Sequence, residues 1–284
     1  MTLDLPQVVG PPVVEVWSHE HSPTFHQNQG VSAALVGELA VVTIELDESP
    51  QGGLHRASEE AYCRLLRELE EMGCPSLWRL WNFFPAINQQ EGGLERYRQF
   101  CIGRHRALVD RLERFPGSLP AGTAVGTKSG PLQILAIAGR QAAVHLGNPR
   151  QVHAYDYPQH YGPCSPSFAR ASLLRVDHTA QLFIAGTSSV VGHESRHPDL
   201  PDAQARETVT NLEALLSHAQ SSHPGSFEGQ RASYRVYVRN VRQVNRIARE
   251  LHEFFSAAQH VLYLQGDLCR SELLVEIEGF VQTP

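Results

Sequence analysis

The sequence has few cysteines and almost no lysine, and both shortages exclude classes of protein. Its five cysteines are odd in number and never stand in a CxxC spacing, which disfavours a disulfide framework and a cysteine zinc site. Lys128 is the single lysine among 24 basic residues, and the formal net charge is −6. A chain without an excess of basic residues is not expected to bind nucleic acid.

Long hydrophobic runs and a leader segment are missing as well. No apolar stretch reaches the roughly 20 residues that span a bilayer, and the opening residues MTLDLPQVVG lack a basic segment followed by an apolar one. We therefore expect no membrane partner and a cytosolic location. No GxxxxGK[ST] phosphate loop and no GxGxxG fingerprint occur, so no nucleotide cofactor is expected.

Two segments could suggest a hydrolase, one as a serine nucleophile elbow and one as a metal site, and neither is accepted as such. The stretch GTSSV that begins at Gly186 carries Val190 where a GxSxG nucleophile elbow requires a second glycine, which makes a serine hydrolase unexpected. His193, Glu194 and His197 lie in a segment that reads as a loop, and this is weak evidence for a metal. No metal site is predicted.

The length of 284 residues favours two domains, and the hydrophobic pattern supports this division. Each half reads β-β-α-β-α-β-β, which predicts an α+β protein with helices packed on one face of mixed sheets. We expect three parts: an extended arm over residues 1–30, an N-terminal domain over 31–150, and a C-terminal domain over 151–284. The expected elements of the first half are two strands within 31–46, strands at 77–84, 122–126, 132–138 and 140–147, and helices at 55–72 and 94–112. Those of the second half are strands at 172–176, 181–186, 233–239, 262–265 and from 272 onward, and helices at 203–217 and 241–255.

The closing stretch LYLQGDLCRSELLVEIE, residues 262–278, places two carboxylates inside an apolar strand. Alternation puts Glu276 and Glu278 on the same face of that strand. A buried carboxylate must be paired with a cation or protonated, and a protonated one can act as a general acid near neutral pH. The alternative is that both lie on the solvated face of an edge strand.

Two other segments could contribute to a site. The strand SYRVYVRN places Arg235, Tyr237 and Arg239 on one face, where an arginine and a tyrosine could clamp a carboxylate. A solvated edge strand would show the same pattern. The segment between the halves, HAYDYPQHYGPCSPSF, is too rich in aromatic residues for a passive linker, so we expect it to pack against another part of the protein.

Four segments together resemble the chorismatases, the enzymes that hydrolyse chorismate or convert it to 3-hydroxybenzoate. They are RLWNFFPAINQQEGGLERYRQFCIGRHRAL (79–108), YPQHYGPCSPSFARAS (157–172), LFIAGTSSVVGHES (182–195) and LQGDLCRSELLVEIEG (264–279). The resemblance implies two tandem domains of the YjgF type, with the active site in the C-terminal one. It also implies chorismate as the small-molecule substrate and either a monomer or a homotrimer.

The resemblance also implies roles for individual residues. Glu276 matches the functional glutamate of the closing strand and would protonate the departing enolpyruvyl group. Arg239, with Tyr237 beside it, matches a carboxylate clamp, and the aromatic segment offers Arg170 and Tyr161 as further substrate-binding residues. Gly186 would allow the substrate ring to approach the backbone.

Cys269 decides the expected product. Relatives that only hydrolyse the enol ether resemble one another in having alanine there, whereas relatives that make 3-hydroxybenzoate carry cysteine. We therefore predict pyruvate and 3-hydroxybenzoate, with some 4-hydroxybenzoate, formed through an arene oxide. The alternatives are hydrolysis to a dihydroxycyclohexadiene carboxylate, a non-catalytic YjgF-like binding protein, and an imine deaminase of the same fold. An inert thiol that fills space is the alternative reading of Cys269.

Overall fold

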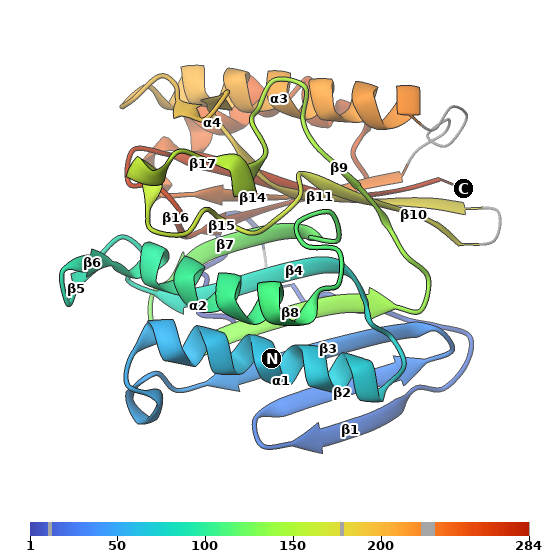
Figure 1. The fold of residues 1–284 in the computed structure, drawn as a ribbon. Coiled ribbons are helices and arrows are strands. Elements are labelled where there is room, and N and C mark those ends of the chain that lie inside the picture. Colours follow the sequence, from blue (N-terminus) through green and yellow to red (C-terminus); the bar gives the residue numbers. More distant parts are fainter. Residues whose placement is uncertain (11–12, 177–178, 223–230, 284) are drawn as a thin grey trace.

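The computed structural model describes residues 1–10, 13–176, 179–222 and 231–283. Within them, two mixed β-sheets stack face to face and the long helices lie outside, which confirms the expected α+β class (Figure 1). The first sheet has the order β1-β2-β3-β8-β4-β7-β16. Its strands are β1 Thr24–Asn28, β2 Val31–Val36, β3 Leu39–Leu46, β4 Ser76–Pro85, β7 Ala121–Thr127, β8 Leu132–Gly139 and β16 Asp267–Leu268.

The second sheet has the order β15-β14-β17-β11-β10-β9. Its strands are β9 Val144–Leu146, β10 Ala171–Val176, β11 Thr179–Ser188, β14 Arg231–Val238, β15 His260–Gln265 and β17 Val275–Gln282. Two small hairpins stand apart from both sheets: β5 Gln90–Glu91 with β6 Leu94–Glu95, and β12 Val190–Val191 with β13 Glu194–Ser195.

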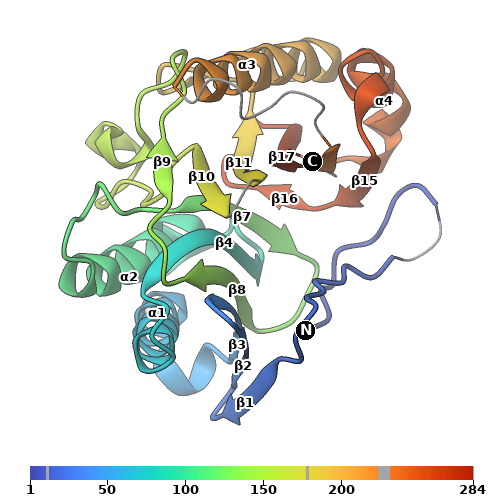
Figure 2. The ribbon, with the colours of Figure 1, turned by 90° about the vertical axis from the view of Figure 1, so that its right-hand side faces the viewer.

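Helices cover the outer face of each sheet (Figure 2). Helices α1 Leu54–Glu71 and α2 Arg96–Arg111 pack on the first sheet, and α3 Pro201–Ser222 and α4 Val244–Leu251 pack on the second. In α1 the buried residues Leu54, Ala61, Leu65 and Leu69 recur at helical spacing, which turns one apolar stripe toward the sheet. None of the helices in the described ranges is long and apolar enough to cross a membrane.

The two halves share the order of elements that the sequence predicted. The first runs β2-β3-α1-β4-α2-β7-β8 and the second β10-β11-α3-β14-α4-β15-β17. In both halves the strands before and after the second helix pair in parallel, β4 with β7 and β14 with β15. A parallel pair needs a crossover connection, and α2 and α4 provide it.

Strand pairing nevertheless crosses the expected boundary at residue 150 in both directions. Strand β9 precedes that boundary but pairs with β10 of the second sheet. Strand β16 lies far beyond it but pairs with β7 of the first sheet. The domain ranges 31–150 and 151–284 stay predictions, and each half contributes a strand to the sheet of the other.

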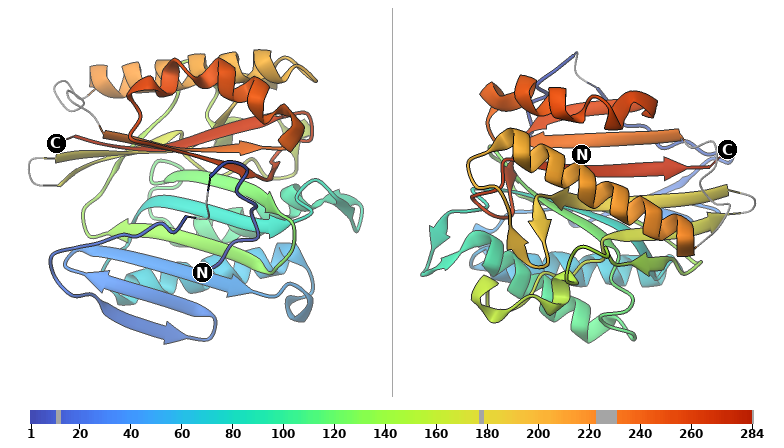
Figure 3. Two further views of the ribbon diagram at one scale, coloured as in Figure 1. Left: turned by 180° about the vertical axis from the view of Figure 1, so that it is seen from behind. Right: turned by 90° about the horizontal axis from the view of Figure 1, so that it is seen from above.

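The N-terminal arm runs past the edges of both sheets (Figure 3). Its Gln7 bridges to Leu264 of β15, and Asp4 accepts a backbone hydrogen bond from Lys128 after β7. The sequence analysis assigned residues 1–30 to an extended arm, and in the structure residues 24–28 of that range form strand β1 of the first sheet. This strand pairs with β2 through a tight turn in which Gln29 and Gly30 have positive φ angles.

The layer between the two sheets is the part of the core that positions the site. The bulky side chains Trp78, Trp81 and Phe83 of β4 enter it from the first sheet, and Phe183 and Tyr237 enter it from the second. Alternation along β4 sends Arg79 and Trp81 into this layer, while Asn82 turns the other way and accepts a hydrogen bond from Tyr62 of α1. The inner layer therefore combines apolar packing with buried charge.

Candidate active site

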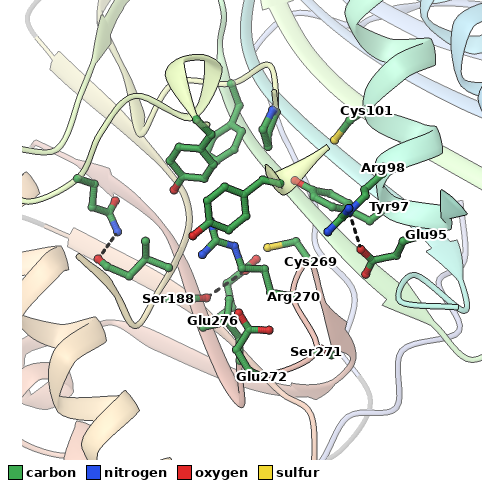
Figure 4. A pocket seen from close by; sticks show the side chains of 18 of the residues that line it. Glu95, Tyr97, Arg98, Cys101, Ser188, Cys269, Arg270, Ser271, Glu272 and Glu276 are labelled. Carbon is green, nitrogen blue, oxygen red and sulfur yellow. Dashed lines mark hydrogen bonds and ion pairs between the residues drawn. The ribbon is translucent and has the colours of Figure 1, made fainter. Parts of the chain in front are cut away.

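A cavity of about 250 Å³ opens at one end of the inter-sheet layer. Both halves line it, although the sequence had placed the site in the C-terminal half alone. The first half contributes Glu95, Tyr97, Arg98 and Cys101 from the start of α2. The second contributes residues of the aromatic segment, of β11 and β17, and of the turn from Cys269 to Leu273. Figure 4 shows these side chains converging from both sides.

Glu276 lies at the inner end of the cavity. Its side chain is only 4% exposed, and the Ser188 hydroxyl donates a hydrogen bond of 3.1 Å to its Oε2. Burial raises the pKa of Glu276 to about 7, and the neighbouring Glu278 carboxylate acts in the same direction. The Ser188 hydrogen bond, Arg79 and Arg170 oppose this rise. The carboxyl is therefore partly protonated at neutral pH, as a general acid requires.

Gly186 lets the Glu276 carboxyl sit against the neighbouring strand. The pairing of β11 with β17 shifts register between Ile184 and Thr187, so Gly186 lies in a bulge. A Cβ atom at Gly186 would lie 2.2 Å from Oε1 of Glu276, which no side chain could accommodate without movement. Gly186 also lines the cavity, as expected from its proposed contact with the substrate.

Glu278 shares the strand face of Glu276 but lies in a different electrostatic environment. Trp81 Nε1, Arg235 Nη1 and Tyr237 Oη donate to its Oε1 at 2.9, 2.7 and 2.9 Å, and Arg79 Nη2 donates to its Oε2 at 2.5 Å. Burial alone would raise the pKa of Glu278, but Arg79 and Arg235 outweigh it and hold the pKa below its usual value. Glu278 is therefore ionised at neutral pH.

Arg170 and Tyr157 form one wall of the cavity. Arg170 is 5% exposed, and its Nη2 donates to the Tyr157 hydroxyl at 2.7 Å and to the carbonyl oxygen of Val152 at 3.2 Å. Its Nε is buried without a partner among the described residues. A buried cation with an unused donor beside a cavity is suited to bind an anionic group.

Arg270 and Tyr161 form a second basic wall. The guanidinium of Arg270 lies 4.1 Å from the centre of the Tyr161 ring and 5.2 Å from that of Tyr157. Its Nη1 donates to the carbonyl oxygen of His193 and to the Ser195 hydroxyl. These contacts fix the plane of the guanidinium at the cavity wall. The sequence reasoning missed Arg270, although it lies next to Cys269 in the closing stretch.

Cys269 lines the cavity together with two further thiols, Cys101 and Cys164. Burial raises the pKa of the Cys269 thiol to about 12, and the nearby Glu276 adds to the effect. Cys269 is therefore a neutral thiol at physiological pH and not a nucleophilic thiolate.

The start of α2 was also missed. Arg98 lines the cavity and forms an ion pair with Glu95, with its Nε 3.3 Å from Oε2. Both residues belong to the longest of the quoted segments, so that segment could have indicated them. Spacing within one helix could not show that α2 faces a turn more than 160 residues later in the chain, at Cys269.

Two expected substrate-binding residues do not line the cavity. Arg239 donates to the carbonyl oxygens of Leu273, Leu268 and Arg270 and to the side chains of Asn88 and Asp267. Its donors are occupied in holding the closing turn, so the geometry does not favour the expected role as carboxylate clamp, which stays a prediction. The expected role of Tyr237 does not fit either, because this fully buried residue bonds to Glu278.

The letters HESRH at residues 193–197 do have the HExxH spacing of zinc proteases, a match that our reading of the sequence had discounted. The structure gives a physical reason to discount it. Glu194 and Ser195 form strand β13, whereas the HExxH motif of zinc proteases lies on a helix, where one turn brings both histidines to the same metal. No group of three metal-ligating side chains occurs in the described parts of the chain.

Comparison with known proteins places this cavity in context. Residues 15–138 match the family described as chorismatase FkbO/Hyg5-like, N-terminal. The chain is 36% identical over 280 residues to a 3-hydroxybenzoate synthase of Streptomyces hygroscopicus, an alignment that covers 95% of this chain and 82% of the relative. It is 34% identical over 276 residues to a chorismatase of Streptomyces rapamycinicus, covering 94% and 81%.

A solved structure agrees with these relatives. The crystal structure of a chorismatase superposes with a TM-score of 0.83 at 29% sequence identity, covering 91% of this chain and 80% of the other. A superposition over 91% of the chain necessarily includes parts of both halves.

Proposed function

The chain belongs to the FkbO/Hyg5-like chorismatase family, and on that premise we propose that it converts chorismate to 3-hydroxybenzoate and pyruvate. The observation that carries the proposal is the state of Glu276. This carboxyl is buried at the end of a cavity lined by three arginines, with a pKa of about 7. A proton donor beside anion-binding groups is the combination that a dicarboxylate enol ether requires.

We assign the substrate carboxylates to Arg170 and Arg270. Chorismate carries one carboxylate on its ring and one on its enolpyruvyl group, so two cationic positions are needed. Arg170 offers an unpartnered Nε, and Arg270 is held flat over Tyr161. Arg98 on the opposite wall adds positive charge to the same cavity, although Glu95 balances part of it.

The reaction begins with transfer of the Glu276 proton to the enolpyruvyl group. The bond between C3 of the ring and the ether oxygen breaks as the C4 hydroxyl oxygen bonds to C3, which releases pyruvate and leaves an arene oxide. The hydroxyl proton that is lost in this step restores the protonated carboxyl. Opening of the bond between C4 and oxygen, with loss of the C3 hydrogen, then gives 3-hydroxybenzoate. The products contain all the atoms of chorismate, so no water is consumed.

Cys269 is proposed to favour this internal route over hydrolysis. Its neutral thiol lines the cavity near Glu276 and occupies space that a water molecule would need (Figure 4). Opening of the arene oxide in the other direction would give some 4-hydroxybenzoate. A smaller side chain at this position would admit water, and the product would be a dihydroxycyclohexadiene carboxylate instead.

The test is incubation of the purified protein with chorismate, without added metal or nucleotide, followed by chromatography of the aromatic products and a pyruvate assay. We expect equal amounts of pyruvate and hydroxybenzoate. The Cys269→Ala variant should still release pyruvate but shift the product toward the diol. Diol from the parent protein would refute the assigned product, and unchanged chorismate would favour a binding protein.

The quaternary structure and the location stay predictions. We expect a monomer or a homotrimer in the cytosol, with chorismate as the small-molecule partner. Light scattering during size-exclusion chromatography distinguishes the two assemblies, because the monomer has a mass of 31.5 kDa.

A further inference from the structure

A single hydrogen bond joins the first half of the chain to the bulge beside Glu276. The backbone N–H of Gly186 on β11 donates to the Oγ1 of Thr123 on β7 at 2.9 Å. This bond crosses from the second sheet to the first. It is available because the bulge between Ile184 and Thr187 releases Gly186 from the regular ladder with β17.

Gly186, Thr123 and Glu276 are packed closely around this bond. A Cβ atom at Gly186 would lie 2.2 Å from Glu276 Oε1 and 3.2 Å from Thr123 Cγ2. The Glu276 carboxyl therefore packs directly against the residue whose N–H Thr123 holds. In the structure this carboxyl accepts a hydrogen bond from the Ser188 hydroxyl, at 3.1 Å.

The Thr123 hydroxyl uses its full hydrogen-bonding capacity in this arrangement. It accepts from Gly186 and from Arg79 Nη2, the latter at 2.5 Å, and its own hydrogen is directed to Glu278, whose anionic form it stabilises. A hydroxyl has two lone pairs and one hydrogen, so none is left over. Thr123 therefore links the Glu278 cluster to the backbone of the cavity.

We infer that Thr123 is a positioning residue for the proposed reaction: its Oγ1 holds the Gly186 N–H and so withholds that donor from the Glu276 carboxyl. This inference rests on the proposed function, in which Glu276 must carry a proton. A backbone N–H donated to a carboxylate favours the ionised form. Thr123 keeps the acid protonated without touching the substrate.

Other ionisable groups that face Glu276 also influence the pKa of its carboxyl. They are Glu278 on its own strand, Arg79 on β4, Arg170 ahead of β10, and Cys269 in the closing turn. A substitution at Thr123 leaves Arg170 and Cys269 with their contacts, whereas Arg79 and Glu278 each lose one hydrogen bond.

The test compares Thr123→Val, which keeps the shape but removes the hydroxyl, with Thr123→Ser, which keeps the hydroxyl. The readouts are kcat and KM for pyruvate release between pH 5.5 and 8. We expect Thr123→Val to lose about tenfold in kcat at pH 8, to recover most of the loss at pH 5.5, and to change KM less than about twofold. Thr123→Ser should stay within about twofold of the parent.

Thr127→Val is the matched control. Thr127 lies on the same strand and face, is 5% exposed, and its hydroxyl has no partner among the described residues. We expect this variant to keep the parent pH profile. Parent-like kcat for Thr123→Val at every pH would overturn the inference. A loss of equal size at every pH would also overturn it, because that would show a merely structural role.

A second measurement does not depend on turnover. Carbon-13 NMR of labelled glutamate carboxyls, with the Glu276 signal assigned through Glu276→Gln, follows its titration directly. We expect a lower midpoint in Thr123→Val, or in Thr123→Ala if the valine variant does not fold, than in the parent. An unchanged midpoint would refute the inference. A parent that releases no pyruvate would instead refute the proposed function and leave this NMR result to decide the role of Thr123.

Discussion

Glu276 and Glu278 are two residues apart on one strand, face the same layer and are equally buried, at 4% and 3% exposure. Their surroundings give them opposite chemistry. Glu278 accepts hydrogen bonds from two arginines, a tryptophan and a tyrosine, while Glu276 accepts one from a serine. Burial raises the pKa of both carboxyls, and only at Glu278 do neighbouring cations reverse the effect.

The difference shows that burial alone does not make a catalytic acid. The cations that compensate one carboxylate are concentrated around Glu278, and this leaves Glu276 poorly compensated and also beside a fixed negative charge. The stable anion thus helps to keep its neighbour protonated. Four experiments test this division of roles, in order of decreasing expected effect.

The largest effect should come from Glu276→Gln. Glutamine has the shape of the protonated acid but cannot donate its proton, so we expect pyruvate release to fall roughly 10²- to 10⁴-fold. At pH 5, where the Glu276 carboxyl is protonated, the melting temperature should change little, since no buried charge is lost or created. Turnover at the parent rate would show that another group supplies the proton.

Glu278→Gln should instead reduce stability. Removing one partner of a buried ion pair typically costs about 3–5 kcal/mol, because the remaining charges stay buried without compensation. Here Arg79 and Arg235 would be left facing a neutral amide. Denaturant titration should show a much larger loss of unfolding free energy than in Glu276→Gln. Equal losses in the two variants would abolish the distinction between the two carboxyls.

The pH dependence of stability should separate them further. The folded-state pKa of Glu276 is raised, so its contribution is fully present at low pH and is lost as pH rises through about 7. The pKa of Glu278 is lowered, so its contribution is present at neutral pH and is lost in acid. Between pH 5 and 8 the parent should lose up to roughly 3 kcal/mol of unfolding free energy that Glu276→Gln does not lose. Parallel curves for the two proteins would contradict the raised pKa.

The smallest expected effect is that of Ser188→Ala. The Ser188 hydroxyl stabilises the ionised form of Glu276, so its removal should raise the pKa of Glu276 further. The ratio of the rate at pH 8 to that at pH 6 should then increase roughly two- to fivefold. A decrease of this ratio would mean that the serine acts through substrate binding and not through the carboxyl.

The order of elements could be predicted because it depends on local periodicity, and both helices and most strands of each half lie within a few residues of their expected positions. The exchange of β9 and β16 between the sheets could not be predicted. Strand β9 lies within the strand expected at 140–147, but nothing local in the sequence shows which sheet it joins, and the two residues of β16 are too few for a periodic signal. Strand β1 was included in the expected arm.

For the site, too, local patterns in the sequence do not show which distant residues come together. Alternation within β17 was enough to put the two glutamates on one face, but their different partners come from β4 and β14, and Arg79 is 199 residues away from Glu278. Arg239 was expected to bind substrate because an arginine at a strand end looks free in the sequence. Only the folded closing turn shows the three carbonyl oxygens that occupy it.

Strand β16 has a further consequence for separating the two halves of the chain. It pairs with β7 and is followed at once by Cys269, so the turn that lines the cavity is anchored to the opposite half of the molecule. An isolated C-terminal half would keep Glu276 but lose the strand that anchors the turn beside it. We therefore expect neither half to act as an enzyme on its own.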